Sequence, residues 1–164
     1  RNRRVGLIAT AASVRSGAYQ RSLRQLDPDI AVTAKACPLF VPLVENGRFR
    51  RGDVVIETVA REYLEPLRRE GLDTLILGCT HYPLLTDIIG DIMGPGVTLI
   101  NTGEEAAWEL KRTLRAMDLL APEGPAGRAT LCASDQPEQF GSLAAYFLGE
   151  SLTRPVQPVD IDQY

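Results

Sequence analysis

The sequence lacks the features that define several large classes of protein. It holds three cysteines, widely spaced and without a Cys-x-x-Cys pair, which argues against a disulfide framework and against a zinc site. No apolar run approaches the ~20 residues that a membrane span needs, and no charged-then-apolar leader marks a signal peptide. We therefore expect a protein of the reducing cytoplasm, with no metal site and no membrane contact.

Other absences narrow the function further. The formal net charge is −3 and the positive charges are dispersed, so the chain has no nucleic-acid footprint. It contains no P-loop, no Gly-x-Gly-x-x-Gly, no internal repeat and no low-complexity tract. What it does have is a hydrophobic content of 45% and a charged content of 24% over 164 residues, which is typical of one ordinary globular domain or two small ones.

Short apolar runs alternate with helical patterns along most of the chain. The expected strands lie at residues 5–9, 30–36, 75–77, 97–100 and 129–133. The expected helices lie at residues 15–26, 54–69, 84–93 and 102–117, with a last helix that ends near residue 148. This alternation predicts an α/β fold with a largely parallel sheet flanked by helices.

Three local patterns carry more specific expectations. Thr102 with Glu105, and Asp135 with Glu138, have the capping-box spacing and are expected to open the last two helices. Trp108 lies on the apolar side of its helix and is expected in the core.

The segment 37–47 is apolar but carries two prolines, which predicts an ordered loop packed on the core. Cys37, followed by Pro38, is expected to be a small buried hydrophobe, and Cys132 is expected to be buried in the last strand. Residues 118–128 are rich in proline and glycine and lose periodicity, so we expect a linker there.

The most informative stretch is Leu75–Leu85, in which an apolar run ends abruptly in Gly-Cys-Thr-His and Pro83 precedes a second apolar run. This pattern places Cys79 and His81, the only histidine, at the C-terminal end of a strand, where open α/β sheets bind ligands. A thiolate there attacks carbon or moves a proton. The sequence around Cys79 lacks the second glycine of a Gly-x-Cys-x-Gly nucleophile elbow, which favours proton transfer. The alternative is a buried cysteine beside a structural histidine.

Three more side chains are candidates for the same site. Thr10 and Ser13 follow the first strand, and they either cap a helix or offer hydroxyls to a carboxylate, with capping favoured from the residues alone. Glu45 is either a solvated loop carboxylate, as composition favours, or a group directed at the site.

The string Leu77–Leu85 resembles the second cysteine motif of bacterial glutamate racemases, members of the aspartate/glutamate racemase superfamily. Its Cys-Thr-His-Tyr-Pro core is specific, and the resemblance covers nearly the whole chain in the family's order. The other matching segments are Val5–Gln20, Ala36–Glu45, Asn101–Glu105 and Ser134–Gly149.

The resemblance implies a cofactor-independent interconversion of L- and D-glutamate, which supplies D-glutamate for peptidoglycan. One cysteine thiolate removes the Cα proton while a second cysteine delivers a proton to the opposite face, a role that suits two bases of one kind. By this comparison Cys79 is the second catalytic cysteine and His81 assists it.

The same comparison gives roles to the other candidates. It implies that Thr80 contacts the substrate and that Thr10 and Ser13 hold the amino-acid head group. It implies, less directly, that Glu45 is a catalytic carboxylate near the site.

One departure limits the resemblance. The family's first catalytic cysteine lies in an Ala-Cys-Asn-Thr segment, and an Asp-Ser-Gly precedes it; neither string is present, and neither Cys37 nor Cys132 substitutes. In the family, two α/β domains face each other across the site. We therefore expect residues 1–100 to be the second domain and residues 101–164 to complete a first domain whose N-terminal half is absent. Such a chain is expected to expose its final helices and to be inactive without the missing half.

Other functions stay open at this level. Within enzymes, the alternative is another member of the superfamily, such as an aspartate racemase or a one-cysteine decarboxylase. Outside enzymes, the alternative is a non-catalytic role, because some glutamate racemases are reported to bind DNA gyrase. The residues do not separate glutamate from aspartate, and a homodimer is among the assemblies that the resemblance allows.

Overall fold

The computed structural model describes residues 2–122, 124, 127–149, 152 and 154–163. The chain forms two compact units, Arg1–Leu120 and Ala121–Tyr164, and each is described by itself.

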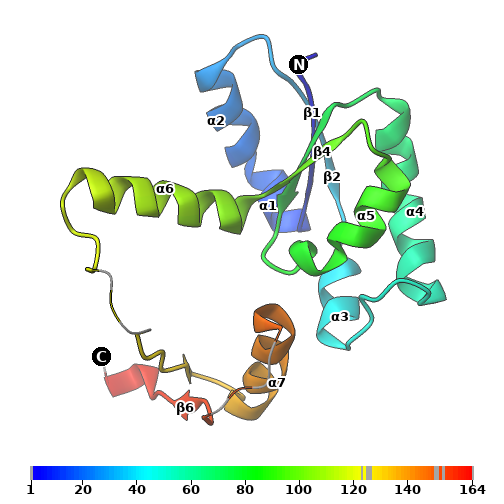
Figure 1. The fold of residues 1–164 in the computed structure, drawn as a ribbon. Helices are drawn as coiled ribbons and strands as arrows, with labels where there is room; N and C mark the ends of the chain where they lie inside the picture. The colour runs from blue at the N-terminus through cyan, green and yellow to red at the C-terminus, as the bar shows by residue number, and fades with distance from the viewer. Residues whose placement is uncertain (1, 123, 125–126, 150–151, 153, 164) are drawn as a thin grey trace. The chain divides into compact units, whose positions relative to one another are not determined.

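The first unit alternates strands with helices, as the sequence predicts (Figure 1). Its strands are β1 (Arg4–Ala9), β2 (Ala31–Ala36), β3 (Thr74–Gly78) and β4 (Thr98–Asn101). Its helices are α1 (Ala11–Ser16), α2 (Ala18–Leu26), α3 (Phe40–Glu45), α4 (Val54–Arg69), the 3-10 helix η1 (Tyr82–Leu85), α5 (Thr86–Met93) and α6 (Thr102–Ala116). The sheet has the order β2-β1-β3-β4 with every pair parallel, so the predicted α/β class is confirmed.

The register brings the carboxyl ends of the strands to one edge. Ala9 pairs with Ala36 on one side and with Gly78 on the other, and Leu77 pairs with Asn101. The residues that follow these strand ends therefore gather at the same edge, which is where the sequence places its candidate chemistry.

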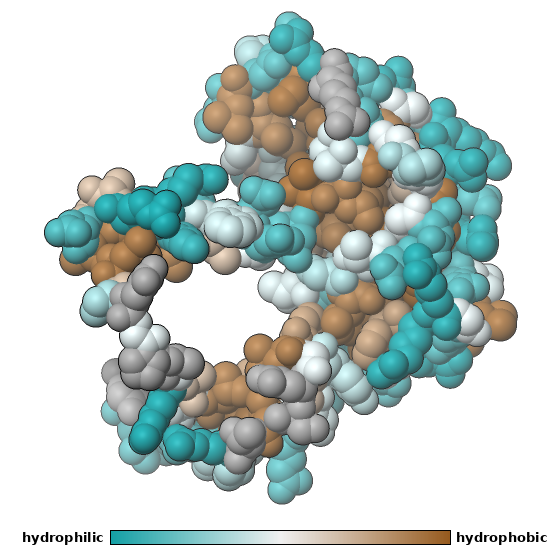
Figure 2. All heavy atoms as spheres, in the orientation of Figure 1, coloured by the Kyte–Doolittle hydropathy of each residue, from teal (hydrophilic) through white to brown (hydrophobic). Residues whose placement is uncertain are grey.

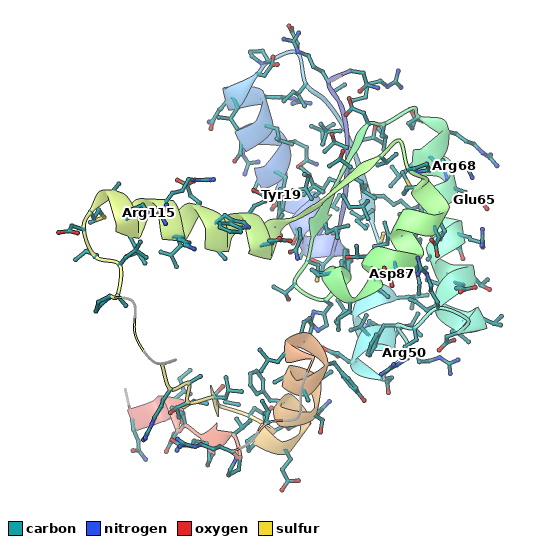
Figure 3. The ribbon with its side chains drawn as sticks, in the orientation of Figure 1. Tyr19, Arg50, Glu65, Arg68, Asp87 and Arg115 are labelled. Carbon is teal, nitrogen blue, oxygen red and sulfur yellow. The ribbon has the colours of Figure 1, made fainter. Side chains whose placement is uncertain are left out.

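Both faces of this sheet are covered, as a parallel sheet requires. Successive strand residues point to opposite faces. Ile8 therefore joins the core under α4 and α5, whereas Leu7 and Ala9 join the core on the opposite face. Tyr19 of α2 packs against that second core (Figure 3). The other partly buried hydrophobic residues packed against that core are Val14, Leu23, Ile30, Val32, Ala34 and Ile100.

The packing between strands leaves no room for a side chain at Gly78. A Cβ added there would lie 2.9 Å from the Cδ1 of Leu7 and 3.1 Å from the carbonyl oxygen of Ile8. Glycine at this position lets β1 and β3 approach closely just before Cys79.

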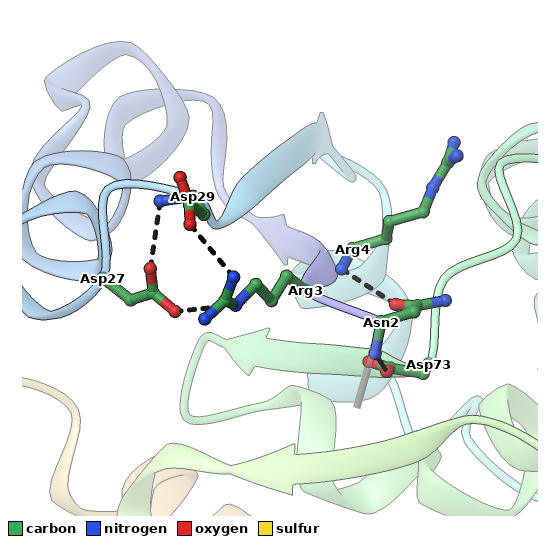
Figure 4. A network of polar contacts seen from close by, with 6 residues as sticks. All are labelled: Asn2, Arg3, Arg4, Asp27, Asp29 and Asp73. Atoms are coloured by element: carbon green, nitrogen blue, oxygen red, sulfur yellow. Dashed lines mark hydrogen bonds and ion pairs between the residues drawn. The ribbon is translucent and has the colours of Figure 1, made fainter.

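The opposite, N-terminal edge of the sheet is tied by polar contacts (Figure 4). Arg3 forms ion pairs of 3.0 Å with both Asp27 and Asp29, which anchors the α2–β2 connection to the start of β1. The backbone N–H of Asn2 donates to Asp73, and this hydrogen bond is the main reason that the pKa of Asp73 lies below its usual value. These groups are largely exposed, so each contact adds little to stability.

Two segments in the first half of the chain differ from the expectation. The helical stretch predicted at 15–26 is two helices, because Gly17 between them adopts a left-handed conformation with φ 63°. The segment expected to be a loop at 37–47 contains α3. Pro42 is the third residue of that helix, where the missing N–H has no intrahelical acceptor, so it does not break the turn.

Neither capping box forms. Asn101 caps α6 instead, with Oδ1 accepting from the N–H groups of Gly103 at 3.1 Å and Glu104 at 3.3 Å. Thr102 is the first residue of the helix rather than its cap, and its hydroxyl donates to the Leu77 carbonyl on β3, at 3.1 Å. The helix α7 (Pro137–Leu148) begins after Gln136, whose backbone is left-handed, rather than after Asp135.

The second unit is small. It holds α7, a 3-10 helix η2 (Ile161–Gln163), and a parallel pair of two-residue strands, β5 (Cys132–Ala133) and β6 (Gln157–Pro158). The predicted strand 129–133 is thus shorter than expected, and Cys132 is exposed rather than buried. The linker expected at 118–128 holds no helix or strand in its described residues; residues 123, 125 and 126 lie outside them.

The expectation for Trp108 is wrong in this chain. The residue is 52% exposed, and α6 buries none of its residues among the parts that the structure describes. Figure 2 shows hydrophobic surface along α6. This agrees with the expectation of exposed final helices, since α7 has no buried residue either. The assignment of residues 101–164 to another domain stays a prediction; the observed units divide after Leu120.

Candidate active site

The candidate site lies at the carboxyl edge of the first unit's sheet. Thr10 directly follows β1 and Cys79 directly follows β3, and these strands are neighbours with Ala9 opposite Gly78. The two side chains predicted for the site therefore leave adjacent strand ends. The fold brings this part of the prediction together without any long loop.

The imidazole of His81 connects Cys79 with Glu45. Its Nδ1 lies 3.8 Å from the Cys79 sulfur, and its Nε2 lies 3.1 Å from Oε1 of Glu45. The His81 side chain is 21% exposed and the Glu45 side chain 38%, so the contact is partly shielded from solvent. Cys79 is half-buried.

This geometry has a direct consequence for the protons. A carboxylate only accepts hydrogen bonds, so the contact to Glu45 favours the tautomer with hydrogen on Nε2. The Nδ1 lone pair then faces the thiol of Cys79 and can accept its proton. The Thr80 hydroxyl lies 3.4 Å from the same nitrogen and is a second donor toward it.

Glu45 reaches the site because the segment 37–47 contains the helix α3. It is the last residue of α3, and its carboxylate extends to His81 across 36 positions of sequence. The interpretation of Glu45 as a solvated loop carboxylate, which composition favoured, is therefore wrong. Whether the carboxylate takes part in a reaction stays a prediction.

Thr10 and Ser13 form the cap that their residue types predict. Thr10 Oγ1 accepts the N–H of Ser13 at 3.3 Å, and the two hydroxyl oxygens lie 3.1 Å apart. Both residues are half-buried, whereas Thr80 is exposed. Contact of any of the three with a substrate stays a prediction.

Cys37 does not contribute a reactive thiol. Its side chain is fully buried, which confirms the expectation, and this burial raises the pKa of the thiol to about 12. The nearby Lys35 lowers that pKa by a smaller amount. No cluster of three or more His, Cys, Asp or Glu side chains suited to a metal ion occurs among the described residues.

One residue of this region carries no signal of its role in the sequence. Tyr82 is fully buried, and its hydroxyl donates to the Cys37 carbonyl at 3.1 Å. The acceptor is a backbone group 45 positions away, so only the folded arrangement identifies the contact. A buried tyrosine hydroxyl that needs a partner is the most that the sequence could have suggested.

The comparisons with known proteins agree with this architecture. The family model described as Asp/Glu/Hydantoin racemase matches residues 1–110. The match covers more than half of the chain, and the chain therefore belongs to the Asp/Glu/hydantoin racemase family.

Within that family, the chain resembles glutamate racemases. It is 46% identical to the glutamate racemase of Mycobacterium ulcerans over 161 residues, which is 96% of this chain and 58% of that protein. The crystal structure of the Thermus thermophilus glutamate racemase in complex with β-chloro-D-alanine matches at a TM-score of 0.82 and 46% identity, covering 98% of this chain and 58% of that chain. The Francisella tularensis enzyme in complex with D-glutamate matches at a TM-score of 0.87 and 32% identity, covering 99% and 59%.

The chain thus spans about three fifths of the length of these relatives. No helix in the described ranges is long and apolar enough to cross a bilayer.

Proposed function

We propose that this chain is the Cys79-bearing part of a glutamate racemase, an enzyme that interconverts L- and D-glutamate by proton transfer at Cα. The observation that carries the proposal is the Cys79–His81–Glu45 arrangement at the carboxyl edge of the sheet, in a chain that belongs to a racemase family. The complex of the Francisella tularensis relative with D-glutamate supports the choice of substrate.

In this proposal the thiolate of Cys79 takes the Cα proton from one enantiomer. His81 Nδ1 first accepts the thiol proton, and Glu45 stabilises the resulting imidazolium through Nε2. The electron pair left at Cα is delocalised into the carboxylate of the substrate. The hydroxyls and backbone N–H groups around Thr10, Ser13 and Thr80 stabilise the charge that develops there.

Inversion needs a second acid on the opposite face of Cα. The resemblance assigns that acid to a cysteine in a segment that this sequence lacks. The chain alone therefore removes and returns a proton on one face and does not invert the centre. The missing portion of the enzyme is the partner that this proposal requires.

Proton NMR of L- and D-glutamate, incubated separately with this chain in D2O, tests the proposal. We expect the Cα signal of one enantiomer to disappear without inversion, with Cys79→Ser abolishing the loss and Cys132→Ser, at an exposed thiol, leaving it unchanged. Inversion by the chain alone would contradict the half-enzyme proposal. Exchange that survives Cys79→Ser would contradict the role of Cys79.

Two further arms complete the test. L- and D-aspartate replace glutamate in one of them, and faster exchange of aspartate would favour an aspartate racemase instead. In the other, the part of the Mycobacterium ulcerans enzyme that this chain does not span is added in trans. We expect racemisation that depends on Cys79, and its absence from a folded mixture would count against the proposal.

A further inference from the structure

The contacts of Tyr82 join the two sides of the candidate site. Its backbone N–H donates to the Cys79 carbonyl at 3.2 Å, so it closes the turn that carries Cys79, Thr80 and His81. Its hydroxyl donates to the Cys37 carbonyl at 3.1 Å, at the end of β2. One buried side chain therefore connects the turn with the segment that leads to Glu45.

The Cys37 carbonyl also marks the start of the helix that carries Glu45. It accepts a second hydrogen bond, from the N–H of Phe40 at 3.3 Å, and Phe40 is the first residue of α3. The Phe40 ring packs edge-on against the Tyr82 ring, with the centroids 5.2 Å apart and the planes at 90°. A polar contact and an aromatic contact thus fix the N-terminal end of α3 to Tyr82.

The remaining contacts connect the C-terminal end of α3 to the turn that carries Cys79. A helix as short as α3 moves as one body, so its start determines where its last residue lies. That residue is Glu45, whose carboxylate is 3.1 Å from His81 Nε2, while His81 Nδ1 faces Cys79. A shift of α3 relative to the Cys79 turn would lengthen the contact between Glu45 and His81.

We propose that Tyr82 is a positioning residue, which holds Glu45 on His81 and so keeps the hydrogen of the imidazole on Nε2. The inference rests on the proposed function, because in that reaction Cys79 gives its proton to the unprotonated Nδ1. Tyr82 touches no reacting atom. Its burial raises the pKa of its phenol above the usual value, so the hydroxyl stays a donor throughout the working range.

The single histidine of the chain makes the test direct. In heteronuclear NMR of the nitrogen-labelled chain, the two imidazole nitrogens can only belong to His81, and their chemical shifts report which one carries hydrogen. We expect a protonated Nε2 and an unprotonated Nδ1 in the unmodified chain. We expect Tyr82→Phe to move the two shifts toward each other, in the direction that Glu45→Gln produces.

Tyr82→Phe is suited to this purpose because the Cys37 carbonyl keeps its hydrogen bond from Phe40 and the ring keeps its packing. The matched control is Tyr19→Phe, which removes a tyrosine hydroxyl on the opposite face of the sheet and should leave the shifts unchanged. Phe40→Leu is a second variant, which keeps the hydroxyl bond but removes the ring contact, and it should shift the nitrogens in the same direction.

The possible outcomes test the positioning role of Tyr82 and the proposed function separately. A folded Tyr82→Phe chain with unaltered imidazole shifts, while Glu45→Gln changes them, would overturn the positioning role even if the melting temperature falls. Where exchange at Cα is measurable, we expect Tyr82→Phe to slow it about five-fold, the loss of one neutral hydrogen bond. Absence of exchange in the unmodified chain would count against the proposed function alone, since the imidazole shifts are read without substrate.

Discussion

Oε1 of Glu45 lies 3.1 Å from Nε2 of His81, although 36 positions of sequence separate the two residues. The first is the last residue of α3 and the second stands in the turn after β3, so the contact spans two elements of the first unit. It makes the imidazole a link between a carboxylate and the thiol of Cys79.

We predict that Glu45→Gln slows the Cys79-dependent exchange of the glutamate Cα proton about ten-fold, because a neutral amide stabilises an imidazolium less than a carboxylate does. A hydrogen bond to a charged group contributes about 1.5–3 kcal/mol, and the partial exposure of Glu45 places the loss at the lower end. The measurement is the initial rate in D2O by proton NMR.

The control for this change is Glu65→Gln, at an exposed carboxylate on α4 (Figure 3). It removes the same charge from the first unit without touching the site. Equal rates in the two variants would show that net charge, rather than the contact with His81, causes the effect.

Cys37 gives a prediction about pH. Burial raises the pKa of its thiol from 9.0 to about 12, so the folded state keeps a proton that the unfolded state loses. Stability from this group is fully present below pH 9 and is lost as the pH rises toward 12. We expect the free energy of unfolding to fall between these values, by at most about 1.4 kcal/mol per pH unit from Cys37.

Urea unfolding of the unmodified chain and of Cys37→Ala, between pH 8 and pH 10 or so, isolates this contribution. The substitution lowers stability at every pH because it leaves a cavity, but its slope with pH should be smaller. Cys132→Ala, at an exposed thiol, should keep the slope of the unmodified chain. Parallel curves for all three proteins would contradict the prediction.

The cap of α6 can be tested in the same way. Asn101→Ala removes the acceptor for two backbone N–H groups and should lower the free energy of unfolding of the first unit by about 1 kcal/mol. Glu105→Ala should cost only a few tenths, because no capping box forms. Equal losses in the two variants would contradict this prediction and would indicate that the capping box suggested by the sequence does form.

The strands of the first unit were predictable because a buried parallel strand needs a short apolar run with a turn signal at its end, and residues such as Leu75–Leu77 followed by Gly78 supply both. The helix caps were less predictable. Thr102 has the right type and spacing, but Asn101 is the cap and the helix begins at Thr102. The Thr102 hydroxyl donates instead to the Leu77 carbonyl of a neighbouring strand, a contact that no local pattern encodes.

The candidate site, too, could be predicted only in part from the sequence. Cys79 and His81 stand two positions apart at a strand end, so the sequence could place them together. Glu45 joins them only because α3 forms despite Pro42, and Tyr82 joins the arrangement through a backbone carbonyl. Trp108 and Cys132 were expected in a core because they are apolar, but their burial depends on what covers them, which their own segments do not specify.

Close packing at the strand end before Cys79 predicts a strong effect of a single methyl group. Gly78→Ala would place its Cβ against Leu7 and the Ile8 carbonyl, at 2.9 and 3.1 Å, and should lower the free energy of unfolding by about 1–3 kcal/mol. It should also slow Cα exchange, because Cys79 is the next residue. Gly96→Ala is the matched control, since nothing lies within 4 Å of its added Cβ, and an equal loss there would contradict the packing argument.

The exposed side of α6 predicts association. Ala107, Leu110, Leu114 and Met117 follow one another at helical spacing, and Leu110 and Met117 are 58% and 60% exposed. An apolar stripe of this kind is stabilised when another surface covers it, so we expect the chain alone to self-associate in sedimentation velocity experiments. Leu110→Lys should weaken that association about ten-fold or more, because burying one leucine contributes ~1.5–3 kcal/mol. Ala116→Lys adds the same charge away from the stripe and should leave association nearly unchanged. An unmodified chain that stays monomeric at every concentration, or an equal effect of the two lysines, would show that the stripe does not drive self-association.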